Sequence, residues 1–104
     1  HDPTHHAELS VIREHCRKAG TLRLDGCTLY CSTEPCPMCS GAIYWARIAR
    51  VVFSVSRHML QQLSGGTPKP PCTALLNLGR RSIEIVGPLL EAEGLDVFRD
   101  YRFH

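Results

Sequence analysis

The sequence has 104 residues, of which 43% are hydrophobic, so it forms one domain at most and carries enough apolar material for a single core. A formal net charge of +2 excludes a strongly basic nucleic-acid binder. No apolar run approaches the roughly 20 residues that a membrane-spanning helix needs. There is no basic and apolar secretory leader, and because the sequence opens without a methionine we expect a trimmed N-terminus.

Apolar periodicity, helix caps and breaker residues predict helices and strands that alternate along the chain. In order, the expected elements are a helix over residues 3–19 ended by Gly20, a strand over 27–31, a helix over 35–48, a strand over 51–55, a helical turn or two over 59–63, a helix over 73–78, a strand over 83–86 and a helix over 89–98. This alternation implies one α/β domain over residues 1–104 with a largely parallel sheet. Because three or four strands are few for such a sheet, we expect that an upstream part is absent.

Several boundaries depend on single residues. Asp2 followed by Pro3 is typical of a helix N-cap and the first helical residue. Asp25 and Gly26 indicate a hairpin turn before the first strand. The segment 64–71 holds two glycines and three prolines, so it is expected to be a loop.

Three residues have the chemistry and spacing of metal ligands. Cys36 and Cys39 begin the second predicted helix, where the electropositive helix N-terminus favours thiolates, and His6 lies thirty residues before Cys36. Three protein ligands with an open fourth position are typical of catalytic zinc sites, whereas structural sites use four. Glu8 is suited to carry a proton from an attacking water to a substrate. Glu34, just before the helix, is expected to serve as a cap or to be solvated.

The six cysteines leave two other arrangements open. Cys27 and Cys31 could join Cys36 and Cys39 in a closed four-cysteine structural site, although this spacing is compressed for two separate zinc knuckles. A secreted protein could instead use three disulfides, but a C-x-x-C pair beside a strand-then-helix pattern favours metal binding in a reducing compartment. We therefore expect a cytoplasmic protein.

The pattern H-x-E followed by P-C-x-x-C resembles the signature of zinc-dependent nucleobase deaminases. Residues 2–8, 34–43 and 46–53 resemble the cytidine and deoxycytidylate deaminase superfamily, in particular the branch with guanine deaminases, fungal-type cytosine deaminases and bacterial tRNA adenosine deaminases. This resemblance implies a three-layer α/β/α sandwich with one zinc ion per subunit, usually dimeric. The implied roles are zinc ligation by His6, Cys36 and Cys39, acid–base catalysis by Glu8, and base contacts from Ala7, Thr33, Glu34 and Pro35.

The sequence also differs from the family that it resembles. Members normally carry an N-terminal helix and two strands before the H-x-E helix, and we expect these to be missing here. Guanine deaminases of this branch usually have an acidic residue after the strand that matches residues 51–55, whereas Ser56, Arg57 and His58 follow it in this chain.

From these features we predict zinc-dependent hydrolytic deamination of a free nucleobase or nucleoside, of guanine, cytosine or adenine type, with release of ammonia. One alternative is a deaminase that acts on tRNA adenosine or another polynucleotide. A second alternative is a non-enzymatic zinc-stabilised interaction module, which would have a closed metal site and no role for Glu8. We expect a homodimer with a small-molecule substrate and no membrane partner.

Overall fold

The computed structural model describes residues 2–66, 68–79 and 81–96. Within this part of the chain, one sheet holds three parallel strands in the order β1-β2-β3. The strands are β1 (Thr28–Thr33), β2 (Arg50–Val55) and β3 (Glu84–Val86). The helices are α1 (Ala7–Ala19), α2 (Pro37–Trp45), α3 (Arg57–Ser64), α4 (Cys72–Leu76) and α5 (Glu91–Leu95). No helix in these ranges is long and apolar enough to cross a bilayer.

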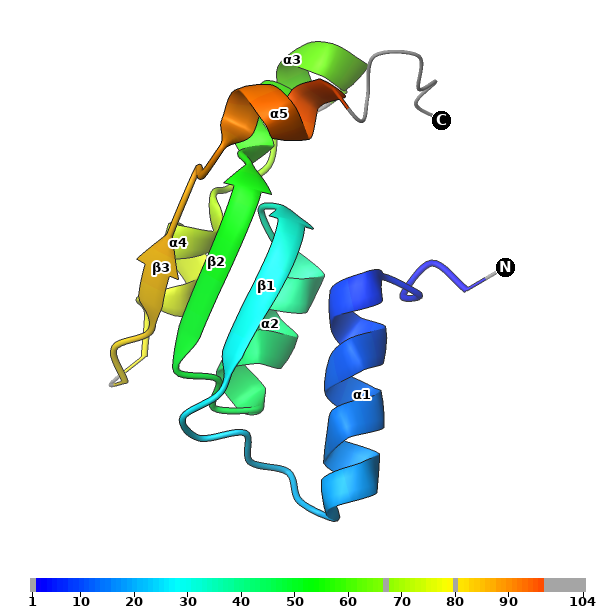
Figure 1. Cartoon of the computed structure of the whole chain (residues 1–104), viewed down its shortest axis with the longest axis vertical. Helices are drawn as coiled ribbons and strands as arrows, with labels where there is room; N and C mark the ends of the chain where they lie inside the picture. Colours follow the sequence, from blue (N-terminus) through cyan, green and yellow to red (C-terminus); the bar gives the residue numbers. More distant parts are fainter. Residues whose placement is uncertain (1, 67, 80, 97–104) are drawn as a thin grey trace.

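Helices α2 and α4 lie behind the sheet in Figure 1 and contact each other, and α1 stands beside α2 near the β1 edge. On the opposite face, α5 contacts β2, where the Ser54 hydroxyl donates to the Leu90 carbonyl over 3.1 Å. Tyr30, on this same face, is 74% exposed. The predicted α/β class with a parallel sheet is confirmed, and in Figure 1 α5 lies at the tip of β2, next to α3.

The core lies between the sheet and the helices behind it. Val51 and Val55 from β2, Ile43 from α2 and Leu76 from α4 are fully buried. The parallel register places Leu29 of β1 beside Val51, on the face that the helices cover. This packing fixes the start of α2 next to the carboxyl end of β1.

Helix α1 begins later than the sequence predicts. The Asp2 carboxylate accepts hydrogen bonds from the backbone amide and the hydroxyl of Thr4, at 2.9 and 2.6 Å, so it closes a local turn instead of capping a helix. The N-cap is His6, which has an extended backbone. The start predicted at Asp2 and Pro3 is therefore wrong, whereas the end at Gly20 is confirmed by its left-handed φ of 64°.

Helix α2 also starts later, at Pro37 rather than at Pro35. Proline suits the first helical position because that residue needs no N–H partner, and it holds the preceding residue in an extended conformation. Cys36 therefore becomes the N-cap, with φ −71° and ψ 170°, and Cys39 lies within the first turn. The predicted start at Pro35 is wrong, but the two cysteines keep their common side of the helix start.

The hairpin predicted at Asp25 and Gly26 is wrong. Gly26 makes a turn with a φ of 78°, but residues 20–27 form no strand, and β1 pairs in parallel with β2 within the described part of the chain. The Leu24 amide donates instead to the Ala46 carbonyl over 2.7 Å, and the Leu24 side chain is buried. The turn thus returns the chain from α1 to the sheet along α2.

The later elements match the predictions in type and differ in their bounds. Helix α3 begins at Arg57, after its Ser56 N-cap and earlier than the turn predicted over 59–63, and α4 ends at Leu76 rather than at residue 78. The loop predicted over 64–71 is confirmed for the described residues after Ser64. Helix α5 is shorter than the helix predicted over 89–98, of which residues 97 and 98 lie outside the described residues, as does the tail from Tyr101 to His104.

Replacing Ile43 by alanine tests how strongly α2 packing holds the fold. Because Ile43 is fully buried, Ile43→Ala removes buried methyl groups and leaves a cavity, and the free energy of unfolding is expected to fall by about 2–5 kcal/mol. Denaturant unfolding followed by circular dichroism measures this loss. Leu22→Ala, at a side chain that is 84% exposed, is the control and should change it by less than about 0.5 kcal/mol. Equal effects of the two substitutions would contradict the assigned core.

Candidate metal centre

His6, Cys36 and Cys39 come together at the carboxyl edge of the sheet. The His6 Nδ1 atom lies 3.4 Å from the Cys36 Sγ atom and 3.5 Å from the Cys39 Sγ atom. The ligand atoms of all three residues lie within 4.8 Å of one another, so one ion can contact them together. An imidazole nitrogen and two sulfurs suit tetrahedral zinc, and three protein ligands leave the fourth position for water or substrate.

Two helix N-termini build this cluster. His6 is the N-cap of α1 and Cys36 is the N-cap of α2, and both helices begin near the tip of β1 in Figure 1. The His6 side chain makes no cap bond to its own helix, so its ring can face the sulfurs. The Cys36 sulfur accepts a hydrogen bond from the Cys39 amide over 3.5 Å, which holds the first turn of α2 around the site.

Burial dominates the titration of Cys39. Its side chain is 0% exposed, and burial raises the pKa of its thiol to about 12, with Cys36 and the Glu8 carboxylate acting in the same direction. Desolvation of the sulfur therefore opposes the field of the helix N-terminus, which favours the thiolate. A bound divalent cation favours the deprotonated sulfur, so metal binding and loss of this proton are coupled.

Glu8 lies beside the cluster without being one of its donors. Its Oε2 atom lies 3.8 Å from the Cys39 Sγ atom, and the residue is half-buried. The pKa of the Cys31 thiol is raised to about 12, mainly by burial and to a lesser extent by the negative charge of Glu8. Residues two apart on a helix face different sides, but His6 precedes the first turn of α1, so both side chains reach the same region.

The remaining cysteines lie outside this group. All six cysteines are free thiols. Among the residues that the structure describes, the metal-capable group contains Cys36 and Cys39 but neither Cys27 nor Cys31. The chain therefore assembles a three-ligand arrangement rather than a closed four-cysteine one. The pKa of the Cys72 thiol is raised to about 12, mainly by burial and to a lesser extent by the negative charge of the nearby Glu34.

Glu34 is a cap, which is one of the two roles expected for it, but it caps later helices rather than the one that follows it. Its side chain is only 5% exposed, so the alternative of a solvated position is wrong. One carboxylate oxygen accepts a hydrogen bond from the Arg57 amide over 3.0 Å, and the other accepts one from the Cys72 amide over 2.6 Å. Arg57 and Cys72 are the first residues of α3 and α4, so one carboxylate satisfies an unpaired N–H at each helix start.

The residues predicted to contact a base surround the cluster. Ala7 is the exposed first residue of α1, Thr33 ends β1 and is half-buried, and Pro35 is fully buried. The Glu34 amide donates to a β2 carbonyl over 2.7 Å, and the Glu34 carbonyl accepts from the Arg57 Nε atom over 3.2 Å. Both backbone groups of Glu34 are thus engaged within the protein, and the four base contacts stay predictions.

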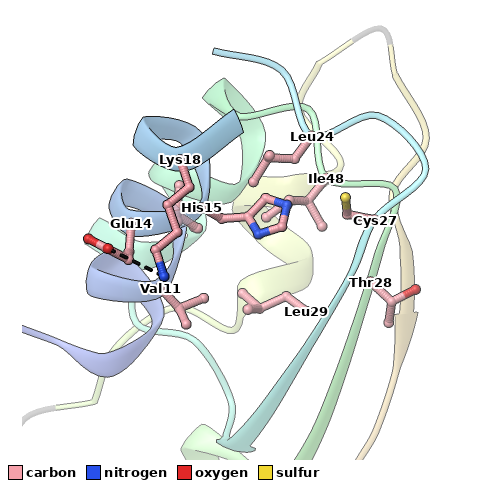
Figure 2. A pocket seen from close by; sticks show the side chains of 10 residues that line it. Val11, Glu14, His15, Lys18, Leu24, Cys27, Thr28, Leu29 and Ile48 are labelled. Carbon is pink, nitrogen blue, oxygen red and sulfur yellow. Dashed lines mark ion pairs between the residues drawn. The ribbon is translucent and has the colours of Figure 1, made fainter. Parts of the chain in front are cut away.

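A separate groove of about 470 Å³ lies between α1 and the β1 edge, as Figure 2 shows. The His15 ring points into it beside the apolar side chains of Leu24 and Ile48. A Glu14–Lys18 ion pair of 3.7 Å lies at its rim. The groove shares no residue with the His6, Cys36 and Cys39 cluster, so it does not contribute to the candidate metal centre.

The model of the cytidine and deoxycytidylate deaminase zinc-binding region matches residues 1–55 of the sequence. This match covers more than half of the chain and contains His6, Glu8, Cys36 and Cys39. The chain belongs to this deaminase family. The cofactor is zinc, because the matched family region is a zinc-binding region and the cluster offers the nitrogen and sulfur donors that zinc prefers.

Relatives with different named substrates share this similarity. The guanine deaminase of Bacillus subtilis is 56% identical over 57 residues, which are 55% of this chain and 36% of that protein. A probable cytosine deaminase of Schizosaccharomyces pombe is 41% identical over 99 residues, which are 90% of this chain and 60% of that protein. A solved structure from a study of A-to-I editing by tRNA:A34 deaminases superposes with a TM-score of 0.70 at 30% identity, covering 92% of this chain and 67% of that chain.

The chain spans only part of the length of these curated relatives, 36% of the guanine deaminase and 60% of the cytosine deaminase. The similarity and the shared architecture confirm the predicted superfamily and its cytidine deaminase-like fold. The names of these relatives include guanine, cytosine and tRNA adenosine.

Loss of one cluster residue is expected to remove the metal. Cys36→Ser replaces a soft sulfur ligand by a hydroxyl, so zinc content should fall from about one ion per chain to a small fraction of that. Metal analysis by plasma mass spectrometry after dialysis against a weak chelator measures this. Cys27→Ser, at a cysteine outside the cluster, is the matched control and should keep its zinc. The cluster assignment fails if the two variants retain equal amounts of metal.

Neutralising Glu34 is expected to loosen both helix starts that it holds. Glu34→Gln keeps the size of the side chain but turns an N–H donor toward the Arg57 or the Cys72 amide, which also donates. Because each bond joins an amide to a charged acceptor, the free energy of unfolding should fall by about 1.5–3 kcal/mol. Chemical denaturation measures the change, and Glu14→Gln on the exposed face of α1 is the control. A Glu34→Gln protein as stable as that control would disprove the double cap.

Proposed function

We propose that this chain forms the catalytic core of a zinc-dependent hydrolase that removes the exocyclic amine of a nucleobase or nucleoside as ammonia. The observation that carries the proposal is a half-buried carboxylate, Glu8, with an oxygen 3.8 Å from the Cys39 sulfur and outside the donor set of His6, Cys36 and Cys39. A structural zinc site does not require a carboxylate beside its ligands, whereas a hydrolytic site requires a group that transfers protons.

The assigned roles follow from the chemistry of the groups. His6 and the two cysteines would hold the ion, which when bound would lower the pKa of a coordinated water and so supply a nucleophile near neutral pH. Glu8 accepts the proton that this water loses and delivers it to the ring nitrogen next to the attacked carbon. Glu8 then takes the proton of the hydroxyl group that is now on this carbon and passes it to the exocyclic amine. The carbon–nitrogen bond breaks, ammonia leaves, and the hydroxyl oxygen becomes the carbonyl oxygen. Water is consumed and ammonia released in equal amounts.

The family similarity supports guanine, cytosine and adenine rings as candidate substrates. All three rings carry an exocyclic amine next to a ring nitrogen, so the same proton transfers serve each of them. A second candidate function is deamination of a base within a polynucleotide. Similarity over 92% of this chain to a structure from work on tRNA:A34 deaminases favours it.

Two further features belong to this proposal. Six free cysteines, three of them buried, fit a reducing compartment, so we place the protein in the cytoplasm. We also propose a homodimer, because Trp45 and Leu78 are 82% and 77% exposed and line one shallow groove over α2 and α4. Large exposed apolar side chains that gather in one place are typical of protein interfaces.

Ammonia release tests the function directly. The zinc-loaded protein is assayed against cytosine, guanine, adenine, their nucleosides and a tRNA anticodon stem-loop, with a coupled ammonia assay as the readout. Turnover of one base or nucleoside supports the leading proposal, and turnover of the stem-loop alone supports the second candidate. No release from any of them would favour the zinc-stabilised interaction module.

Glu8→Gln separates the enzyme from a structural module. The variant keeps the size of the side chain but cannot carry a proton, so kcat should fall by about 10²- to 10⁴-fold while zinc content stays unchanged. Steady-state kinetics together with metal analysis measures both quantities. Glu14→Gln, on the same helix and exposed, is the matched control and should keep full activity. Full turnover in Glu8→Gln would show that another group moves the proton.

A further inference from the structure

A further pocket is lined in part by Glu34, two residues before the cluster residue Cys36. Its volume is about 260 Å³, and it lies between the first turn of α3 and the connection that leads to α4. It is lined by Glu34, Arg57, His58, Gln61, Pro68, Lys69 and Pro71. Two basic side chains, one histidine, one amide and one carboxylate therefore line a single small cavity.

The cations of this pocket differ from other basic residues near the sheet. Arg47 and Arg50 each form an ion pair, with Asp25 at 3.2 Å and with Glu84 at 3.7 Å. The Arg57 Nε atom instead donates to a backbone carbonyl, and within the described residues its guanidinium forms no ion pair.

Lys69 carries the second cation of the pocket. Its ammonium group has neither an ion pair nor a hydrogen bond among the residues that the structure describes. The side chain is exposed at the mouth of the pocket, beside Pro68 and Pro71. Proline has a fixed φ, so these neighbours restrict the backbone that carries the lysine.

The one carboxylate of the pocket does not neutralise these charges through contact. Both oxygens of Glu34 are occupied by the Arg57 and Cys72 amides, and the side chain is 5% exposed. The two cations against one carboxylate leave a net charge of +1, or +2 when His58 is protonated. A small anion with several oxygens matches this set of donors.

The pocket also has a defined relation to the metal centre. Glu34 lines the pocket, and Cys36 follows it by two residues, so their backbones lie within about 7 Å. The pocket and the cluster therefore lie at the same carboxyl edge of the sheet, joined by the short segment from Glu34 to Cys36. A phosphate attached to the sugar of a base at the cluster is the anion whose position fits.

We propose that the pocket formed by Arg57, His58, Gln61 and Lys69 binds the phosphate of a phosphate-bearing nucleoside whose base lies at the metal centre. This inference rests on the proposed deaminase function and narrows its substrate class. The phosphate belongs either to a free nucleotide or to an RNA backbone, which present the same charged oxygens. Arg57 and Lys69 supply the attraction, while the Glu8 and zinc region supplies the chemistry.

The test begins with inorganic phosphate as the probe, titrated into the zinc-loaded protein by calorimetry. Lys69→Ala loses no hydrogen bond or ion pair in the described structure and should weaken binding about tenfold. Arg57→Ala should weaken it by at least as much. Arg23→Ala changes net charge equally at an exposed residue paired with Asp25, and it should leave phosphate binding nearly unchanged. Equal weakening in all three variants, or no phosphate binding at all, would overturn the pocket assignment.

The source of the phosphate is then resolved with a nucleoside, its 5′-monophosphate and a short single-stranded RNA. A gain of about tenfold for the monophosphate over the nucleoside, lost in Lys69→Ala, assigns a free nucleotide. A gain confined to the RNA and lost in the same variant assigns an RNA backbone, and both results support the pocket. Equal affinity for all three ligands overturns it.

Binding in the Glu8→Gln variant keeps this inference separate from the proposed function. Phosphate binding that persists in Glu8→Gln, with Lys69 still required, upholds the pocket whether or not any substrate is deaminated. Deamination of a base or nucleoside by a protein that shows no phosphate binding upholds the function and removes the pocket.

Discussion

Four helices begin at or beside the carboxyl edge of one small parallel sheet, and their unpaired backbone N–H groups gather on the same side of the molecule. Such groups require acceptors, and the chain supplies them from residues close to the site. The Cys36 sulfur serves α2, the Ser56 hydroxyl serves α3, and the Glu34 carboxylate serves α3 and α4 together. The clustering of helix N-termini at this edge therefore has two consequences. The N–H groups need acceptors, and the edge can hold a cation through its ligands and anions through its donors.

Most of what lies close together in sequence could be predicted from it. The strand before P-C-x-x-C, the helix after it and the pairing of Cys36 with Cys39 all follow from local preferences and spacing. The start of α1 was missed because the same Asp2 carboxylate that could cap a helix bonds Thr4 instead, and sequence alone does not decide between these local bonds. The Asp25-Gly26 turn forms no hairpin because the segment before it hydrogen-bonds to the end of α2 rather than to a neighbouring strand.

What could not be predicted depends on contacts that are distant in sequence. Glu34 bonds amides 23 and 38 residues further on, so no local pattern marks it as the cap of two later helices. The same distance hides the phosphate pocket, whose cations come from α3 and from the connection that follows it. His6 and the cysteines were found despite a separation of thirty residues because the metal fixes their residue types, and carboxylate capping imposes no comparable signature.

The double bond of Glu34 also bears on how such a domain can change over evolutionary time. One buried carboxylate fixes the first residues of α3 and α4, so α3 and the connection up to α4 form an excursion with both ends anchored. Lengthening an anchored surface connection costs little chain entropy. The segment that carries Lys69 is therefore free to vary in length and charge while the metal centre beside it stays unchanged. Changes in this segment could therefore alter which ligand is preferred without altering the residues of the metal centre.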